Sequence, residues 1–155
     1  MDFYLPDNID KLRIKTRNFV DQHIIPLEAV ASSFDNHENI NETLLNEIRD
    51  KIKLEGLWSP QMPKTRRGLG LGPIGMAAIY EEMNRSIFGP VCFNCAAPDD
   101  GNMYILNKIA TEEQKVEWLD PIINGDVRSS LAMTEPAPGG GSDPSMIKTV
   151  ATYQN

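Results

Sequence analysis

The residues best placed to do chemistry lie in a turn-rich stretch near the end of the sequence, at residues 131–145, which reads LAMTEPAPGGGSDPS. Pro136 and Pro138 have no N–H group to give to a sheet ladder. The three glycines after them can adopt positive φ and present bare main-chain N–H groups. Ser142 and Asp143 can close the turn by hydrogen bonding to the local backbone. Such a loop suits an anion, or the polar edge of a ring, held by main-chain donors.

Two other patterns could carry chemistry. Cys92 and Cys95 have the C-x-x-C spacing of a redox pair or of half a zinc site, but there is no second cysteine pair to complete such a site. Residues 70–75, GLGPIG, match the dinucleotide pattern G-x-G-x-x-G, which needs a buried strand before it. The preceding residues, Pro63 to Arg67, are too polar for that strand. We therefore predict small core thiols, no dinucleotide loop and no metal site.

Composition narrows the class of protein. The 155 residues carry a net charge of −7 at pH 7, with no compact basic patch to offset it. This argues against nucleic acid as a partner. The N-terminus does not look like a signal peptide, and no apolar run is long enough to cross a bilayer. We expect a cytoplasmic protein without a membrane span.

The order of residues in the loop is more specific than its composition. The letters AMTEP at 132–136, followed by GSD at 141–143, resemble the flavin-binding signature of the acyl-CoA dehydrogenase family. The spacer between them, residues 137–140, is longer here than in the best-known members. Upstream stretches resemble the same family at residues 56–60, 81–86 and 111–121. Residues 93–103 resemble a branch of the family that handles longer acyl chains.

The resemblance implies FAD as the cofactor, an acyl-CoA as the substrate and an electron-transfer flavoprotein as the acceptor. It also implies a homo-oligomer for a full-length form. By resemblance, the flavin-contacting residues are Leu131, Met133, Thr134, Gly141 and Ser142. Ser142 would also lie against the substrate.

The catalytic residue is a separate matter. The family's catalytic carboxylate lies in a C-terminal bundle, beyond residue 155, so no catalytic residue is assigned in this sequence. Glu135 sits within the signature but does not correspond to that base.

The elements that must position the loop are mainly helical. Apolar spacing predicts helices over about 6–25, 42–55, 73–86 and 100–109, and a short helix from the capping box at Thr111 to Pro121. Asn41 and Asp100 are predicted N-caps, and Gly56 is predicted to follow a helix C-terminus. Alternation predicts strands over about 127–134 and 147–153.

The predicted fold is an acyl-CoA dehydrogenase-like N-terminal helical bundle, residues 1–126, followed by the first strands of a β domain, residues 127–155. Family members are more than twice this long, so we expect a truncated form that is inactive alone. Three alternatives stay open: an acyl-CoA oxidase on the same fold, a non-enzymatic helical module that binds a partner, and a thiol redox protein. The sequence does not give the acyl chain length.

Overall fold

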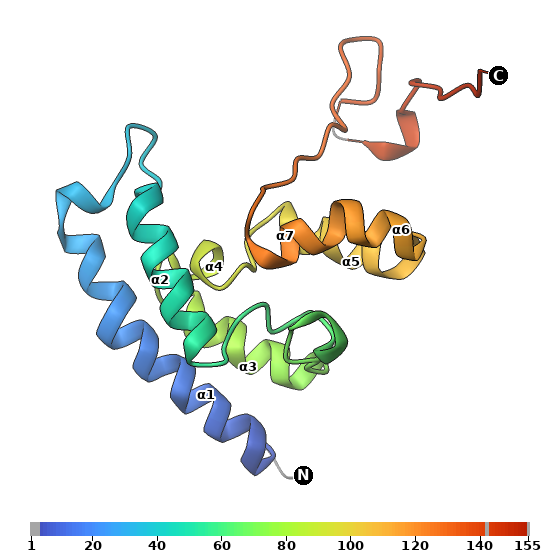
Figure 1. Cartoon of the computed structure of the whole chain (residues 1–155). Coiled ribbons are helices and arrows are strands. Elements are labelled where there is room, and N and C mark those ends of the chain that lie inside the picture. Colours follow the sequence, from blue (N-terminus) through green and yellow to red (C-terminus); the bar gives the residue numbers. More distant parts are fainter. Residues whose placement is uncertain (1–3, 142, 155) are drawn as a thin grey trace.

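The structure, a computed structural model, describes residues 4–141 and 143–154. It consists of a body of packed helices from which the C-terminal segment extends (Figure 1). The α-helices are α1 (Asp7–Phe19), α2 (Glu42–Leu54), α3 (Pro73–Met83), α4 (Gly89–Cys92), α5 (Asp99–Ile109), α6 (Glu112–Gln114) and α7 (Asp120–Asn124). Turns of π-helix continue α1 over Val20–Ile24 and join α6 to α7 over Lys115–Leu119. The 3-10 turns are Ile25–Ala29, Ala31–Ser33, Lys64–Arg66 and Pro144–Met146.

Local sequence explains where several helices begin and end. The Asn41 side chain caps α2 by accepting from the N–H groups of Thr43 and Leu44, and Gly56 follows that helix with φ +65°. Pro73 opens α3, where its missing N–H has no cost. Thr111 and Gln114 form the predicted capping box at α6. These predicted features are confirmed, and the glycines before Pro73 lead into a helix without a preceding strand.

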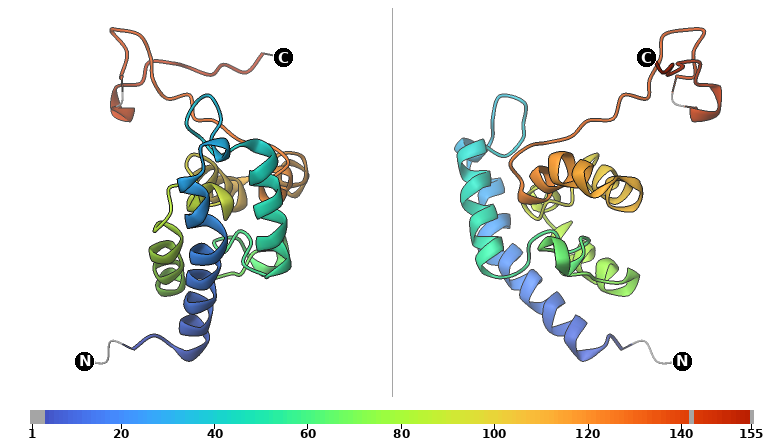
Figure 2. Two further views of the ribbon diagram at one scale, coloured as in Figure 1. Left: turned by 90° about the vertical axis from the view of Figure 1, so that its left-hand side faces the viewer. Right: turned by 45° about the vertical axis from the view of Figure 1, so that its right-hand side comes forward.

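The helices pack in two groups. Helix α1 lies along α3, and α2 lies against α4. Helices α5 and α7 pack together with the π turn between α6 and α7. In Figure 1 this second group lies on the other side of α4 from α2, and Figure 2 shows the same body from two further directions. The predicted mainly helical fold is confirmed.

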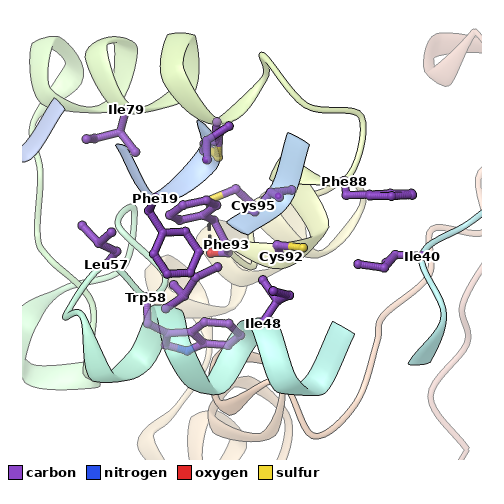
Figure 3. Close-up of a cluster of buried hydrophobic side chains, with 14 residues drawn as sticks. Phe19, Ile40, Ile48, Leu57, Trp58, Ile79, Phe88, Cys92, Phe93 and Cys95 are labelled. Atoms are coloured by element: carbon purple, nitrogen blue, oxygen red, sulfur yellow. Dashed lines mark hydrogen bonds between the residues drawn. The ribbon is translucent and has the colours of Figure 1, made fainter. Parts of the chain in front are cut away.

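The larger hydrophobic core forms between α1, α2, α3 and α4 (Figure 3). Phe93 is fully buried at its centre, and its ring meets that of Phe19 edge-on with 6.0 Å between centroids. Trp58 closes one side of this core, and its Nε1 donates to the carbonyl of Ile123, 2.7 Å away. A smaller core beside α5 and α7 contains Met62, Met103, Leu119, Ile122 and Ile123.

Asn94 joins the two cores. Its side-chain amide donates to the Ser59 hydroxyl at 2.9 Å and to the carbonyls of Ile122 and Ile123 at 3.0 and 3.2 Å. The residue is buried and has φ +61°, a conformation that asparagine tolerates better than most residues. One polar side chain therefore fixes the end of α7 against the turn after Trp58.

A buried carboxylate fixes α1 against α3. The Glu82 side chain is 1% exposed, and it accepts from Arg13 and Arg17, each at 2.9 Å, with Arg85 at 3.7 Å. Burial alone would raise the pKa of Glu82, but the hydrogen bonds from Arg17 and Arg13 outweigh it and hold the pKa below 4.5. The charge is buried only because three guanidinium groups surround it.

Two predictions differ from the structure. Residues 127–134 and 147–154 have no ladder hydrogen bonds in the described parts of the chain, whose only β-bridge joins Phe34 to Ile40. Alternation gives each segment a strand-like pattern, but two short segments without a sheet to join are not stable as strands. Asp100 is not a cap: α5 begins at Asp99, and the Asp100 carboxylate instead accepts from the Tyr80 hydroxyl at 2.5 Å.

Candidate functional site

The predicted flavin-contacting residues lie on the C-terminal segment, outside the helical body. Leu131 is 64% exposed, Met133 is half-buried and Thr134 is exposed. Gly141 follows them in the loop, and Ser142 lies outside the described residues. The structure thus keeps the described members on one short stretch that leads away from α7 (Figure 1).

Met133 and Thr134 carry three hydrogen-bond donors that a ligand could meet. Among the described residues, the N–H groups of both and the Thr134 hydroxyl have no hydrogen-bond partner. Free main-chain donors beside a hydroxyl match the carbonyl and nitrogen acceptors along the edge of a flavin ring. The residues present therefore fit the group that the sequence implied.

Glu135 closes the loop that follows. Its Oε2 accepts from the Gly140 N–H at 3.1 Å, and its Oε1 accepts from the Thr149 N–H at 2.6 Å and from the Thr149 hydroxyl. The Lys148 N–H donates to both oxygens, at 3.0 and 3.1 Å. The bond from the Thr149 hydroxyl, with those from the Lys148, Gly140 and Thr149 N–H groups, lowers the pKa of Glu135 to about 2. We call this set, Glu135 with Gly140, Lys148 and Thr149, the Glu135 clasp.

Close approach of neighbouring atoms requires glycine at two of the three positions. A Cβ on Gly139 would lie 2.6 Å from the Glu135 Oε2, and a Cβ on Gly140 would lie 2.6 Å from the Asp143 carbonyl oxygen. Gly141 has φ +54°, where a side chain would be strained. The Asp143 carboxylate accepts from the N–H and hydroxyl of Ser145, so it supports the next turn. The glycine run is shaped by close approach as well as by flexibility.

An acidic residue of α5 ties the segment to the helical body. The Asp99 carboxylate accepts from the Ser129 N–H at 2.6 Å, the Ser129 hydroxyl at 2.7 Å and the Arg128 guanidinium. Asn102, one turn further along α5, donates to the Ser129 hydroxyl at 2.9 Å. Sequence reasoning did not assign these roles to Asp99 or Asn102. The neighbouring acidic pair at 99–100 was a signal, but it also suited a helix cap.

The two cysteines are core residues, as predicted. Cys92 and Cys95 are buried free thiols. Desolvation by burial raises the pKa of Cys92 to about 12 and raises that of Cys95 as well. In the described part of the chain, no group of three or more His, Cys, Asp or Glu side chains could hold a metal ion.

The cavities of the helical body lie elsewhere. One of about 450 Å³ is lined by residues that include Lys53, Trp58, Arg67 and Asn124, where the C-termini of α2 and α7 approach each other. Another, of about 680 Å³, lies beside the 35–42 loop and includes Arg128 in its wall. Arg66, which has the basic residues Lys64 and Arg67 near it in the sequence, is held in ion pairs with Glu112 and Asp120, both at 2.5 Å. That pairing favours a structural role for Arg66.

Across residues 4–141 and 143–154, no helix is long and apolar enough to cross a membrane. The predicted cytoplasmic location stays a prediction.

Comparison with known proteins finds a matching family model and similar relatives. The model of the acyl-CoA dehydrogenase N-terminal domain matches residues 6–126. The chain is 36% identical over 140 residues to acyl-CoA dehydrogenase family member 11 of Gallus gallus, covering 86% of this chain and 18% of that protein. It is 36% identical over 129 residues to the Homo sapiens protein of that name, covering 79% of this chain and 16% of that protein.

A solved structure is similar in both sequence and fold. It is that of a Mycobacterium abscessus protein assigned as an acyl-CoA dehydrogenase, with a TM-score of 0.78 and 32% identity. The alignment covers 87% of this chain and 36% of that protein. The chain therefore spans about a sixth of the length of the first curated relatives and about a third of this structural neighbour.

Proposed function

Because the chain belongs to the acyl-CoA dehydrogenase family, we propose that it forms the N-terminal part of an FAD-dependent enzyme that introduces a double bond between the α and β carbons of an acyl-CoA thioester. The long-chain branch of the family stays a prediction. So does the boundary between a helical domain ending at residue 126 and a β domain beginning at 127. The end of α7 at Asn124 and the end of the family match at 126 support that boundary.

The observation that carries the proposal is the set of free donors at Met133 and Thr134. Both residues lie in the part of the chain that resembles the family's flavin signature, and their N–H groups and the Thr134 hydroxyl have no partner among the described residues. We propose that they hold the pyrimidine edge of FAD, with Leu131 beside them and Gly141 and Ser142 toward the pyrophosphate or the CoA moiety. When bound, FAD supplies the acceptor for the hydride that leaves the β-carbon.

The chain's own residues have a limited part in this reaction. Removal of the α-proton requires a carboxylate in contact with the substrate and a polarised thioester carbonyl. We assign that carboxylate to no residue of this chain, because the resemblance puts it beyond residue 155. Glu135 is unsuitable as a base, since its oxygens are occupied by the clasp and its pKa is about 2.

The proposed partners follow from the family and from the surface. An electron-transfer flavoprotein would reoxidise the flavin. The helical body exposes apolar side chains that further protein could cover. Those on α5 and the π turn after α6 are Tyr104, Ile105, Ile109, Val116 and Trp118. These residues support the proposed homo-oligomer.

The proposal can be tested in a fused protein in which residues 6–154 replace the matched region of the Mycobacterium abscessus protein. We expect this fusion to bind FAD and to lose its flavin absorbance when an acyl-CoA is added. Thr134→Val should weaken FAD binding by about 1–3 kcal/mol, because a donor to a buried acceptor is lost. Thr65→Val, at an exposed position in the helical body, is the matched control.

The isolated 155-residue chain gives the complementary result. It should bind FAD weakly or not at all, because a few hydrogen bonds of about 1 kcal/mol each do not offset roughly 4 kcal/mol or more for immobilising a ligand. A folded fusion that stays colourless in excess FAD would overturn the proposed function.

A further inference from the structure

The Glu135 carboxylate has an arrangement that its sequence position does not explain. It is half-buried, next to a proline, and its two oxygens accept from three main-chain N–H groups and one hydroxyl. The donors come from both arms of the loop, five residues away at Gly140 and 13 and 14 residues away at Lys148 and Thr149. One side chain thus closes residues 135–149 into a ring.

The rest of the loop is built around this carboxylate. Gly139 passes so close to Glu135 that any side chain at 139 would collide with the carboxylate. Gly140 is buried and turns its N–H inward to the carboxylate. Met133 and Thr134, which precede Glu135 directly, keep their donors unpaired among the described residues. The clasp therefore pairs the N–H groups of Gly140, Lys148 and Thr149 with Glu135. Among the described residues, it leaves those of Met133 and Thr134 unpaired.

We propose that Glu135 is the positioning residue of the flavin loop. It holds residues 135–149 closed, so that Met133 and Thr134 present their donors in a fixed orientation. This inference rests on the proposed function and deepens it, because it assigns a role to a residue of the motif that the proposed function leaves without one. A loop that is already closed has less conformational freedom to lose when a ligand binds, which favours affinity.

The first test uses the 155-residue chain and measures amide hydrogen exchange by NMR. Glu135→Ala should speed exchange at Gly140, Lys148 and Thr149 by about tenfold or more, because charged hydrogen bonds are lost. Glu135→Gln should also speed exchange at the Gly140 amide, because the NH2 group of Gln cannot accept a hydrogen bond from that N–H. Asp143→Asn is the matched control: it should affect Ser145 and leave those three amides unchanged.

Exchange measured at a series of pH values distinguishes protection by the ionised Glu135 carboxylate from protection by general packing of the loop. The pKa of Glu135 is lowered to about 2, so the clasp should stay ionised and its protection factors should be constant between pH 7 and pH 4. A carboxylate with an ordinary pKa of 4.5 would lose about half of this protection near pH 4.5. Equal exchange at Gly140, Lys148 and Thr149 in the wild-type chain and Glu135→Ala would overturn the inference.

The second test measures FAD binding in the fused protein. Glu135→Gln should raise the dissociation constant for FAD about tenfold, while the melting temperature of the helical body stays unchanged. If exchange accelerates but FAD affinity is unchanged, the clasp is purely local and the positioning role is wrong. If the wild-type fusion binds no FAD, the proposed function itself fails, and this result is distinguishable because it appears before any substitution is made.

Discussion

The helical body and the C-terminal segment satisfy their polar groups in opposite ways. In the body, Glu82 is buried and meets Arg13 and Arg17, which are 69 and 65 residues away along the chain. In the segment, Glu135 lies near the surface and meets donors no more than 14 residues away. The body depends on contacts between distant elements, and the segment depends on one local ring and one tie to α5. The two regions should therefore respond very differently to the same chemical change.

The largest contrast is expected for apolar side chains. Phe93→Ala removes a fully buried ring from the main core and should lower the free energy of unfolding by about 3–5 kcal/mol. Leu131→Ala, at a position that is 64% exposed, should change it by less than about 0.5 kcal/mol. Urea denaturation followed by circular dichroism measures both. Equal losses would show that the segment is as tightly packed as the body.

Glu82→Gln should have the next largest effect. It removes the charge that three arginines surround, but these arginines reach solvent, so we expect a loss of about 2–3 kcal/mol. Because the folded-state pKa of Glu82 is depressed, its contribution is fully present above the ordinary pKa of 4.5 and is lost as the pH falls through the folded pKa. The wild-type chain should therefore lose more stability than the variant when the pH is lowered below 4.5. Denaturation at pH 7 and at successive acidic pH values tests this, and parallel curves would contradict it.

Asp99→Asn breaks the tie between the two regions. One oxygen can still accept from Ser129, but the charged bond from Arg128 is lost, so a cost of about 1–2 kcal/mol is expected. Limited proteolysis should then cut residues 127–134 faster, while the helical body stays intact. Asp126→Asn, at an exposed position, is the control. Unchanged cleavage would show that Asp99 does not hold the segment.

A pair of threonines gives the smallest contrast. Thr16 is fully buried and donates to the Leu12 carbonyl at 3.0 Å, so Thr16→Val should cost about 1 kcal/mol. Thr134→Val should leave the unfolding free energy of the isolated chain within about 0.5 kcal/mol of the wild-type value. Thermal denaturation compares the two. A substantial loss for Thr134→Val would mean that its hydroxyl has a partner within the protein.

Sequence patterns predicted the structural features that a few consecutive residues determine. The Thr111–Gln114 capping box and the Asn41 cap each involve a few consecutive residues, and both are confirmed. The buried ion pairs of Glu82 join helices far apart in the sequence, and no local pattern marks them. The prediction for Asp100 was wrong because an acidic residue at the start of a helix suits either a cap or a tertiary partner. The flavin-site residues rest on a resemblance, and the Glu135 clasp required three-dimensional geometry.

The position of Asn94 between the two cores has a consequence for how the body unfolds. Its amide holds the carbonyls at the end of α7, while its neighbours Phe93 and Cys95 belong to the larger core. Neither core can open without breaking this junction and leaving buried carbonyl groups without donors, which is costly. The two helical groups should therefore melt as a single cooperative unit, with matching calorimetric and van't Hoff enthalpies, although they bury separate sets of side chains.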